Sequence, residues 1–376
     1  MKTLNSSSQR GLTLIELMIA MLIGVFLIAG IIQIFISSKQ AYRLQENMAR
    51  LQENGRFAMD FISKGVRMAG YTGCSSSAKN TRVMAKTDVS PVLTLTAISG
   101  RNNVTSDWIP TQPKVCGTTT DDCIAGTDVL NFMTSGSCGG TLTGNMQADN
   151  ANIQIVAPNT CNLDAGEVVI ISDCSSADVF AATTISGGVA SGKETIAHAM
   201  NLNIDNKLSK AYQGDSEIFA PKLMSYYLRS GASGVPALWR FDSTDINSEP
   251  EELIEGIENM QVVYGVDTDT TQDYVPNYYV DASKVTDWSK VVNIRISLVA
   301  VSVENNLLDE PQPYTYLVEK NGTYNYESIT PPKIYARPKD TSQICKPSST
   351  TGCIQVNDLR LRRVFSSTIA LRNRMP

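Results

Sequence analysis

The sequence predicts an α+β fold in which one long N-terminal helix packs on an antiparallel β-sheet. An apolar stretch runs from Gly11 to Ile36, a helical pattern continues to about Gly65, and short apolar runs separated by turn-forming residues fill most of the remainder. The chain has eight cysteines, and six of them lie between positions 74 and 174. We therefore expect a disulfide-stapled β-rich insertion beside the main sheet.

The apolar stretch is long enough to cross a bilayer, since about 20 helical residues span ~30 Å of hydrocarbon. A polar leader carrying Lys2 and Arg10 precedes it. By the positive-inside rule these cations stay in the cytoplasm, so the rest of the chain is sent outward. We expect a single-pass inner-membrane protein with its C-terminal domain in the periplasm.

The junction between leader and helix is unlike an ordinary secretory signal, which is cleaved after a shorter apolar core. Here the natural cleavage point precedes the apolar stretch. Cleavage after Gly11 would remove residues 1–11 and leave a new amine on Leu12, with Glu16 fifth in the mature chain. A carboxylate at membrane depth costs a few kcal/mol unless it is paired. Glu16 either reaches the headgroups or neutralises the Leu12 amine of a neighbouring subunit.

Residues 11–16, Gly-Leu-Thr-Leu-Ile-Glu, resemble the class III leader of type IV prepilins and type II secretion pseudopilins. The resemblance implies that a prepilin peptidase cuts between Gly11 and Leu12 and methylates the Leu12 amine. It also favours the pairing of Glu16 with a neighbouring subunit. Leu12 departs from the family pattern, because most members carry Phe there.

Beyond the apolar stretch, one helical face collects small and apolar residues spaced by three and four positions. They are Leu44, Met48, Leu51, Gly55, Ala58, Ile62 and Gly65. We expect one helix from about Thr13 to about Ala69. Residues 12–36 would form its transmembrane and assembly part, and residues 37–70 an amphipathic continuation packed on the globular domain.

Residues 71–214 are rich in Ser, Thr, Gly and Asn and predict a β-rich, disulfide-containing region. Strands are expected at 91–98, 128–133, 153–156, 167–171, 179–185 and 195–199. Eight periplasmic cysteines predict disulfides rather than a metal site, because no CxxC spacing occurs and His198 is the single histidine. Proximity in sequence suggests the pairs Cys74 with Cys138, Cys116 with Cys123, Cys161 with Cys174, and Cys345 with Cys353.

Residues 215–376 predict a C-terminal α+β region. We expect a strand pair at 223–228 and 237–241, and further strands at 261–266, 292–298 and 359–371. Ser248 and Glu251 form a capping-box pattern that predicts a short helix, with an apolar face of Leu253, Ile254, Ile257 and Met260.

Three segments of this region resemble PilW-type minor pilins, the type IV pilus counterparts of the J-type minor pseudopilin. They are 253–269, 287–302 and 359–374. The resemblance implies a pilin-like, non-enzymatic subunit that joins other minor pilins and the major pilin. It would prime pilus assembly in a tip complex, help display a tip adhesin, and thereby support twitching motility and adhesion.

Other motifs carry weaker chemistry. Asp267, Asp269, Thr271 and Asp273 place oxygen ligands at alternate residues, which fits either a calcium loop or a solvated acidic turn. No other cofactor is expected.

The run from Gly187 to Lys193 matches a phosphate-binding loop in spacing, but Glu194 would repel phosphate, and a hairpin turn is favoured.

A nucleic-acid partner is not expected, because the net charge is −5. The arginines at 360, 362, 363, 372 and 374 fit a solvated strand face better. Two alternatives to the pilus subunit stay open at this point. One is a minor pseudopilin of a type II secretion system, and the other is a tip adhesin that binds through residues 74–214.

Overall fold

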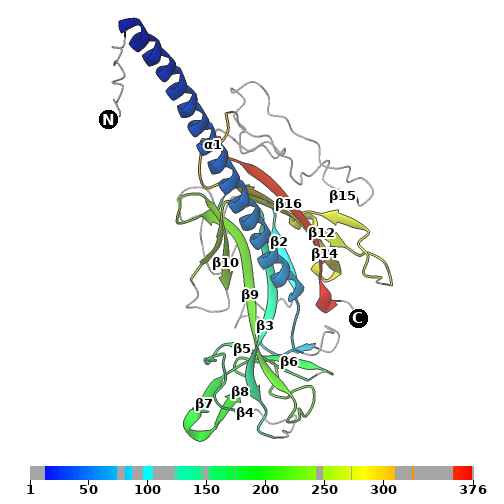
Figure 1. Ribbon diagram of the computed structural model, residues 1–376. Helices are drawn as coiled ribbons and strands as arrows, with labels where there is room; N and C mark the ends of the chain where they lie inside the picture. The colour runs from blue at the N-terminus through cyan, green and yellow to red at the C-terminus, as the bar shows by residue number, and fades with distance from the viewer. Residues whose placement is uncertain are drawn as a thin grey trace, which may run out of the picture. The chain divides into compact units, whose positions relative to one another are not determined.

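The computed structural model describes residues 13–73, 81–86, 96–104, 123–124, 126–144, 146, 152–173, 175–242, 249–271, 273–309, 324–325 and 359–374 (Figure 1). The chain divides into two compact units, residues 1–50 and 51–376. Together, a long helix and antiparallel sheets confirm the predicted α+β class.

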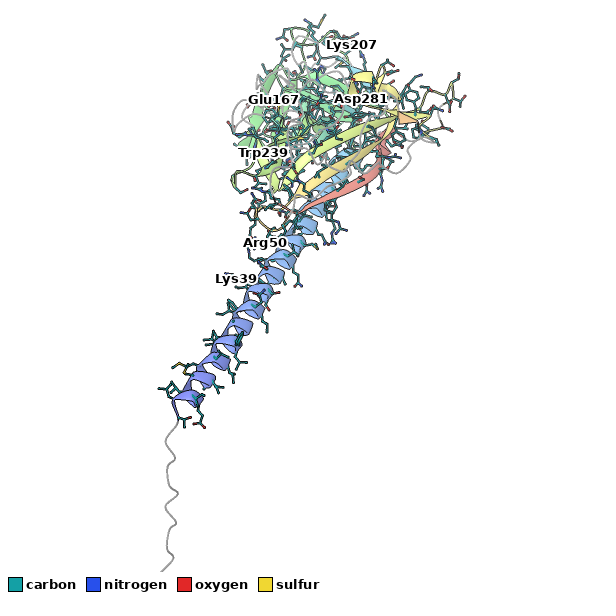
Figure 2. The ribbon with its side chains drawn as sticks, turned by 90° about the horizontal axis from the view of Figure 1, so that it is seen from above. Lys39, Arg50, Glu167, Lys207, Trp239 and Asp281 are labelled. Atoms are coloured by element: carbon teal, nitrogen blue, oxygen red, sulfur yellow. A yellow bond between two sulfur atoms is a disulfide. The ribbon has the colours of Figure 1, made fainter. Side chains whose placement is uncertain are left out.

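Helix α1 spans Leu14–Arg67, close to the predicted bounds. In its second half Leu51, Ala58, Ile62 and Val66 are buried, and they recur at the spacing of one helix face. The chain then leaves the helix through a turn at 68–70, shortly after the basic residues of the last turn. Figure 2 shows the α1 side chains, with Lys39 and Arg50 marking where charged residues resume after the apolar stretch.

An eight-stranded sheet, the large sheet, forms the greater part of the second unit. Its strands are β1 (Thr81–Val83), β2 (Ile98–Arg101), β3 (Val129–Thr141), β5 (Val168–Ser172), β6 (Ala177–Ala181), β9 (Glu217–Ser230), β10 (Pro236–Asp242) and β11 (Glu251–Glu255). The order is β1-β6-β5-β9-β10-β11, and β3 pairs with both β2 and β9. All pairs are antiparallel except β1 with β6. Helix α1 is bonded to this sheet, since the Tyr226 hydroxyl donates to the Phe61 carbonyl at 3.2 Å.

A five-stranded antiparallel sheet, the C-terminal sheet, completes the part that contacts α1. In order it contains β15 (Tyr324–Asn325), β13 (Tyr278–Val280), β12 (Ile257–Val266), β14 (Val291–Val301) and β16 (Arg362–Ala370). Strand β14 alternates buried Ile294, Ile296 and Leu298 with more polar residues, as its sequence predicts. The ring of Phe365 on β16 lies against Gly55 of α1, where the glycine leaves room for it.

A small third sheet contains β4 (Asn152–Val156), β8 (Lys193–Ala197) and β7 (Thr184–Gly188). Strands β7 and β8 form a hairpin whose tip is the short helix η3 (Val189–Ser191). This glycine-rich tip is the segment that matches a phosphate-binding loop in spacing, and it is the hairpin turn that the sequence favours. The predicted single strand at 179–185 is divided here between β6 and β7.

The predicted short helix after Ser248 is wrong. Residues 251–255 form β11, which pairs with β10 and places Leu238 opposite Ile254, and residues 257–266 form β12. Gly256 separates the strands at a φ of 75°, and a Cβ there would lie 2.6 Å from the Val301 carbonyl oxygen. Only glycine accommodates this turn without strain, so cross-strand pairing overrides the local helical pattern. Ser248 lies outside the described residues.

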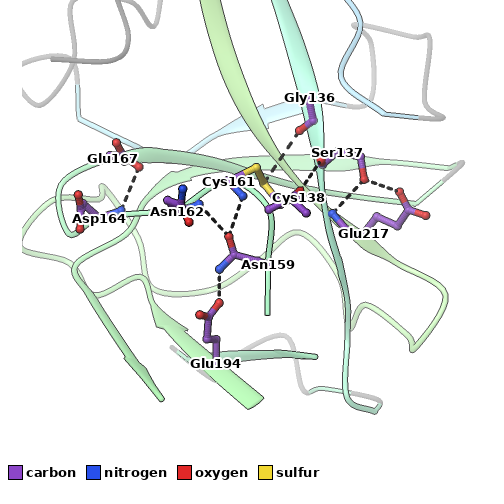
Figure 3. The surroundings of a disulfide bond; sticks show 12 residues. Gly136, Ser137, Cys138, Asn159, Cys161, Asn162, Asp164, Glu167, Glu194 and Glu217 are labelled. Carbon is purple, nitrogen blue, oxygen red and sulfur yellow. Dashed lines mark hydrogen bonds between the residues drawn. A yellow bond between two sulfur atoms is a disulfide. The ribbon is translucent and has the colours of Figure 1, made fainter. Parts of the chain in front are cut away.

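The described disulfide joins Cys138 to Cys161, which corrects our expected pairs of Cys74 with Cys138 and Cys161 with Cys174 (Figure 3). The end of β3 lies beside the loop 157–161, and the Thr160 amide donates to the Cys138 carbonyl at 2.8 Å. Folding therefore brings Cys138 closer to Cys161 than sequence proximity suggests. Cys123 is disulfide-bonded as well. The remaining cysteines, Cys74, Cys116, Cys174, Cys345 and Cys353, lie outside the described residues.

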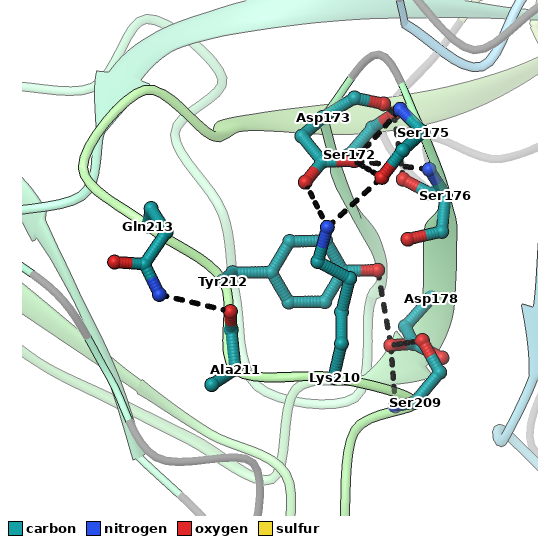
Figure 4. Close-up of polar contacts among 10 residues, drawn as sticks. All are labelled: Ser172, Asp173, Ser175, Ser176, Asp178, Ser209, Lys210, Ala211, Tyr212 and Gln213. Carbon is teal, nitrogen blue, oxygen red and sulfur yellow. Dashed lines mark hydrogen bonds and ion pairs between the residues drawn. The ribbon is translucent and has the colours of Figure 1, made fainter.

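A buried polar network ties two loops of the insertion together (Figure 4). Asp178 is fully buried, and its Oδ2 accepts hydrogen bonds from the Ser209 amide at 2.8 Å and the Tyr212 hydroxyl at 3.0 Å. Nearby, the Lys210 ammonium contacts the Asp173 carboxylate. These contacts satisfy Asp173 and the Oδ2 atom of Asp178, whereas the buried Oδ1 atom of Asp178 has no hydrogen-bond partner among the described residues.

Candidate functional site

The first described turn of the chain is a capping box at the start of α1. The Glu16 carboxylate oxygen Oε2 accepts hydrogen bonds from the Thr13 amide at 3.0 Å and the Thr13 hydroxyl at 2.9 Å. In return, the Glu16 amide donates to the Thr13 hydroxyl oxygen at 3.3 Å. Gly11 and Leu12, the predicted cleavage junction, lie outside the described residues.

This capping box orients Glu16 toward the beginning of the helix. Helix N-termini have amide groups without helical partners, and a Thr followed three residues later by Glu satisfies two of them. Both bonds reach the same carboxylate oxygen, so Oε1 is not needed for the cap. Our sequence reasoning singled out Glu16 but missed Thr13, although the Thr-x-x-Glu spacing is itself a readable signal.

The helix that follows has apolar side chains with no cover from the described protein. Leu14 is 78% exposed and Phe26 is 71% exposed. Among the described residues, α1 is the one helix long and apolar enough to cross a membrane. A continuous apolar surface of this length is stable in lipid or against other proteins, but not in water.

A smaller exposed apolar set lies at the end of α1. Phe57 and Phe61 of the helix and Met68 of the turn after it are each between 39% and 47% exposed. The four-residue spacing of Phe57 and Phe61 places them on one side of the helix, beside the face that packs on the sheets. Aromatic side chains exposed in this way are typical of protein contact surfaces.

The candidate calcium ligands lie in the turn after β12. Carboxylate oxygens of Asp267, Asp269 and Asp273 lie within 4.8 Å of one another, and Thr271 is exposed in the same turn. Asp267 is buried, and its two oxygens accept from the backbone amides of Asp269 and Tyr274, both at 3.0 Å. These bonds also fit the acidic-turn alternative. Calcium binding at this turn stays a prediction.

The arginines near the C-terminus do not form one exposed face. Arg362 is buried and binds Glu258 through two hydrogen bonds of 2.7 and 3.0 Å. Arg363 is exposed beside the Phe365 ring. The expectation of a solvated face is therefore wrong for Arg362, because Glu258 on β12 reaches across the sheet to pair with it. The side chain of Arg374 lies outside the described residues.

His198 is fully buried, and its ring centroid lies 5.0 Å from that of Phe180. Its packing inside the insertion supports the structural interpretation of this histidine.

Two family models match separate parts of the chain. Residues 6–32 match the prokaryotic N-terminal methylation motif. Residues 225–373 match the type IV pilus-assembly protein W. No significant match was found among curated proteins or solved structures. The two matches cover the capping box and the C-terminal sheet, and they confirm the resemblance to PilW-type minor pilins.

Proposed function

We propose that this chain, which has a type IV pilin-like role by these two matches, is a minor pilin. It would be a structural, non-enzymatic subunit of a priming complex at the pilus tip, where it initiates assembly and supports display of a tip adhesin. Twitching motility and adhesion would depend on it through the pilus. The observation that carries the proposal is the Thr13–Glu16 capping box at the start of an exposed apolar helix.

The proposed maturation begins at the leader. Prepilin peptidase would cleave between Gly11 and Leu12 and methylate the Leu12 amine. The new N-terminus would then be one residue before Thr13, whose amide and hydroxyl donate to the Glu16 carboxylate. In the inner membrane the C-terminal domain would lie in the periplasm of a Gram-negative bacterium.

The proposed assembly step pairs Glu16 with the Leu12 amine of a neighbouring subunit. A carboxylate in a low-dielectric environment is costly without a counter-charge, so the pairing favours an assembly over a lone helix. The capping box supports this role because it holds the carboxylate in place and leaves Oε1 for a second donor. Since this chain retains Glu16, it can dock beneath another minor pilin rather than only at the outermost position.

Extraction from the membrane requires replacement of lipid contacts by protein contacts. Each fully buried Leu, Ile or Phe side chain contributes about 1.5–3 kcal/mol relative to water. The exposed side chains of α1 would obtain this burial from other minor pilins and from the major pilin. Phe57, Phe61 and Met68 are a second exposed apolar set and would contact the same partners.

The experiment compares Glu16→Gln with Glu16→Ala in cells that lack the native gene. Glutamine can keep the hydrogen bonds of the capping box but has no charge. Alanine removes the hydrogen bonds and the charge together. We expect both variants to be cleaved normally and to reduce surface pili at least tenfold. Glu46→Gln is the control, because Glu46 forms an exposed pair with Arg50 and should not affect assembly.

Mass spectrometry of the N-terminal peptide measures cleavage and methylation. The amount of pili sheared from the cells measures assembly. Normal piliation in Glu16→Gln would overturn the charge-pairing role. A mature chain that begins beyond Ile36 would overturn the proposed function as a whole.

The type II pseudopilin alternative differs in what the assembled subunit serves. The match to a pilus-assembly protein favours the pilus. In a deletion strain we expect loss of twitching with normal protein secretion, and the opposite result would favour the pseudopilin.

A further inference from the structure

A short strap, residues 123–124 and 126–128, connects the large sheet with the C-terminal sheet. At one end the Ile124 amide donates to the Leu228 carbonyl of β9 at 2.9 Å. At the other end the Asp128 amide donates to the Met260 carbonyl of β12 at 3.0 Å. The next residue, Val129, begins β3 of the large sheet. The strap therefore passes from one sheet to the other within a few residues.

The strap binds the part of the β12 edge that lies before Tyr264, where no described strand pairs with it. Strand β13 pairs with β12 at Tyr264–Val266 only. Before that point, the Val262 amide donates to the Asp128 oxygen Oδ2 at 2.7 Å. The other oxygen, Oδ1, accepts from the Asn103 amide at 2.8 Å, just beyond β2. One carboxyl group thus holds the edge of β12 and the segment after β2 at a single point.

Asp128 is 2% exposed and has an unfavourable electrostatic environment. The charge of Asp281 acts on it unfavourably, because Asp281 is also acidic, and Asp281 is itself paired with Lys284 at 3.0 Å. Tyr264 of β12 also faces Asp128, and its buried hydroxyl has no hydrogen-bond partner among the described residues. Burial, reinforced by Asp281, raises the pKa of Asp128 to about 7 even though two amides donate to it.

We propose that Asp128 is a pH-sensitive clasp between the two sheets, closed when its carboxyl group is protonated and loosened when the group is ionised. The geometry carries this inference, because the carboxyl group lies at the junction, is removed from water, and bonds at once to the edge of β12 and to the segment after β2. The clasp is independent of Glu16 and of the membrane helix.

The direction of the pH effect follows from proton linkage. In an opened junction Asp128 meets water and its pKa returns to about 3.9, whereas in the closed junction its pKa is about 7. The closed form therefore binds more protons between these values, and its stability falls as the pH rises through this window. The opening equilibrium should increase about tenfold per pH unit between pH 5 and 6.5 and level off above pH 7.

Hydrogen exchange of the full mature chain in detergent micelles tests the clasp from pH 5 to 8.5. Exchange rates are corrected for the pH dependence of intrinsic amide exchange. We expect peptides covering residues 257–263, which include the Val262 amide, to show the tenfold change per unit and the plateau. Peptides covering β5 should not show it, because the described partners of β5 are β6 and β9. A flat corrected profile at 257–263 would overturn the proposal.

The Asp128→Asn variant removes the titrating group. Asparagine can accept only through one oxygen, so basal protection should fall at every pH, but the pH slope should disappear. Persistence of the slope in this variant would contradict the clasp. Asp205→Asn is the control, since Asp205 is an exposed partner of Arg82 far along the chain, and the slope should be unchanged.

A second variant covers the case in which Asp128→Asn does not fold. Asp281→Asn keeps a residue suited to cap the turn at Ser283 and removes the negative charge that faces Asp128. The plateau should then begin at a lower pH than in the unmodified chain. A plateau at the same pH would show that the titrating group is not Asp128.

Discussion

The two halves of helix α1 have the same secondary structure and opposite surroundings. In the first half, from Leu14 to Ile36, the large apolar side chains are exposed. In the second half, Leu51, Ala58, Ile62 and Val66 are buried against the sheets of the same chain. The apolar side chains of the second half are thus buried by the same chain. Those of the first half require lipid or another subunit to cover them.

This difference separates stability from assembly. Burial within the chain contributes to the free energy of unfolding of the globular part. Under the proposed function, side chains exposed in the isolated chain would contribute to membrane insertion and to subunit contacts instead. Matched substitutions in the two halves should therefore have different effects on the same measurement.

The largest expected effect comes from truncation of a buried isoleucine. Ile62→Ala should lower the free energy of unfolding by about 3 kcal/mol, because it removes methylene groups and leaves a cavity. Ile28→Ala, at a site that is 59% exposed, should leave it unchanged. Urea unfolding in detergent micelles, followed by tryptophan fluorescence, measures both. Equal losses would contradict the division of the helix.

A smaller effect is expected from added methyl groups at two glycines of α1 that differ in their surroundings. A Cβ at Gly55 would meet the Phe365 ring, whereas a Cβ at Gly24 has no described atom within 4 Å. Gly55→Ala should destabilise the globular part by about 1–2 kcal/mol through overpacking. Gly24→Ala should have no effect on its unfolding, and any loss there would indicate an unrecognised contact.

The smallest effect should be equal for two exposed ion pairs that both lie beyond the apolar first half of α1. The pairs Glu46–Arg50 and Asp60–Lys64 are exposed, each with an N–O distance of 2.7 Å and a spacing of four residues. Because solvent screens such pairs, Arg50→Ala and Lys64→Ala should each change the free energy of unfolding by less than about 0.5 kcal/mol. A larger change at Lys64 alone would mean that the sheet beside it strengthens the pair.

Features that depend on neighbouring residues were predicted well. The bounds of α1, the alternation of β14 and the glycine-rich hairpin at 187–193 all follow from periodicity or turn chemistry. The Thr13–Glu16 capping box could have been predicted too, because its spacing is local.

Features that depend on distant residues were predicted poorly. The spacing after Ser248 fits a helix, but β10 and β14 offer cross-strand partners that favour β11 and β12. Cys138 is bonded to Cys161, because the fold decides which sulfurs meet. Nothing around Asp128 in the sequence indicates that its carboxyl group bonds to Val262, 134 positions away.

By itself, the sequence determined a membrane-length helix, an acidic residue at its start and a strand-rich globular part, because each is a property of residues close together in the chain. The tertiary structure alone decided which half of the helix is covered, how the strands pair and where Asp128 is buried. Contacts of this kind depend on packing between segments far apart in sequence, and no local pattern records them.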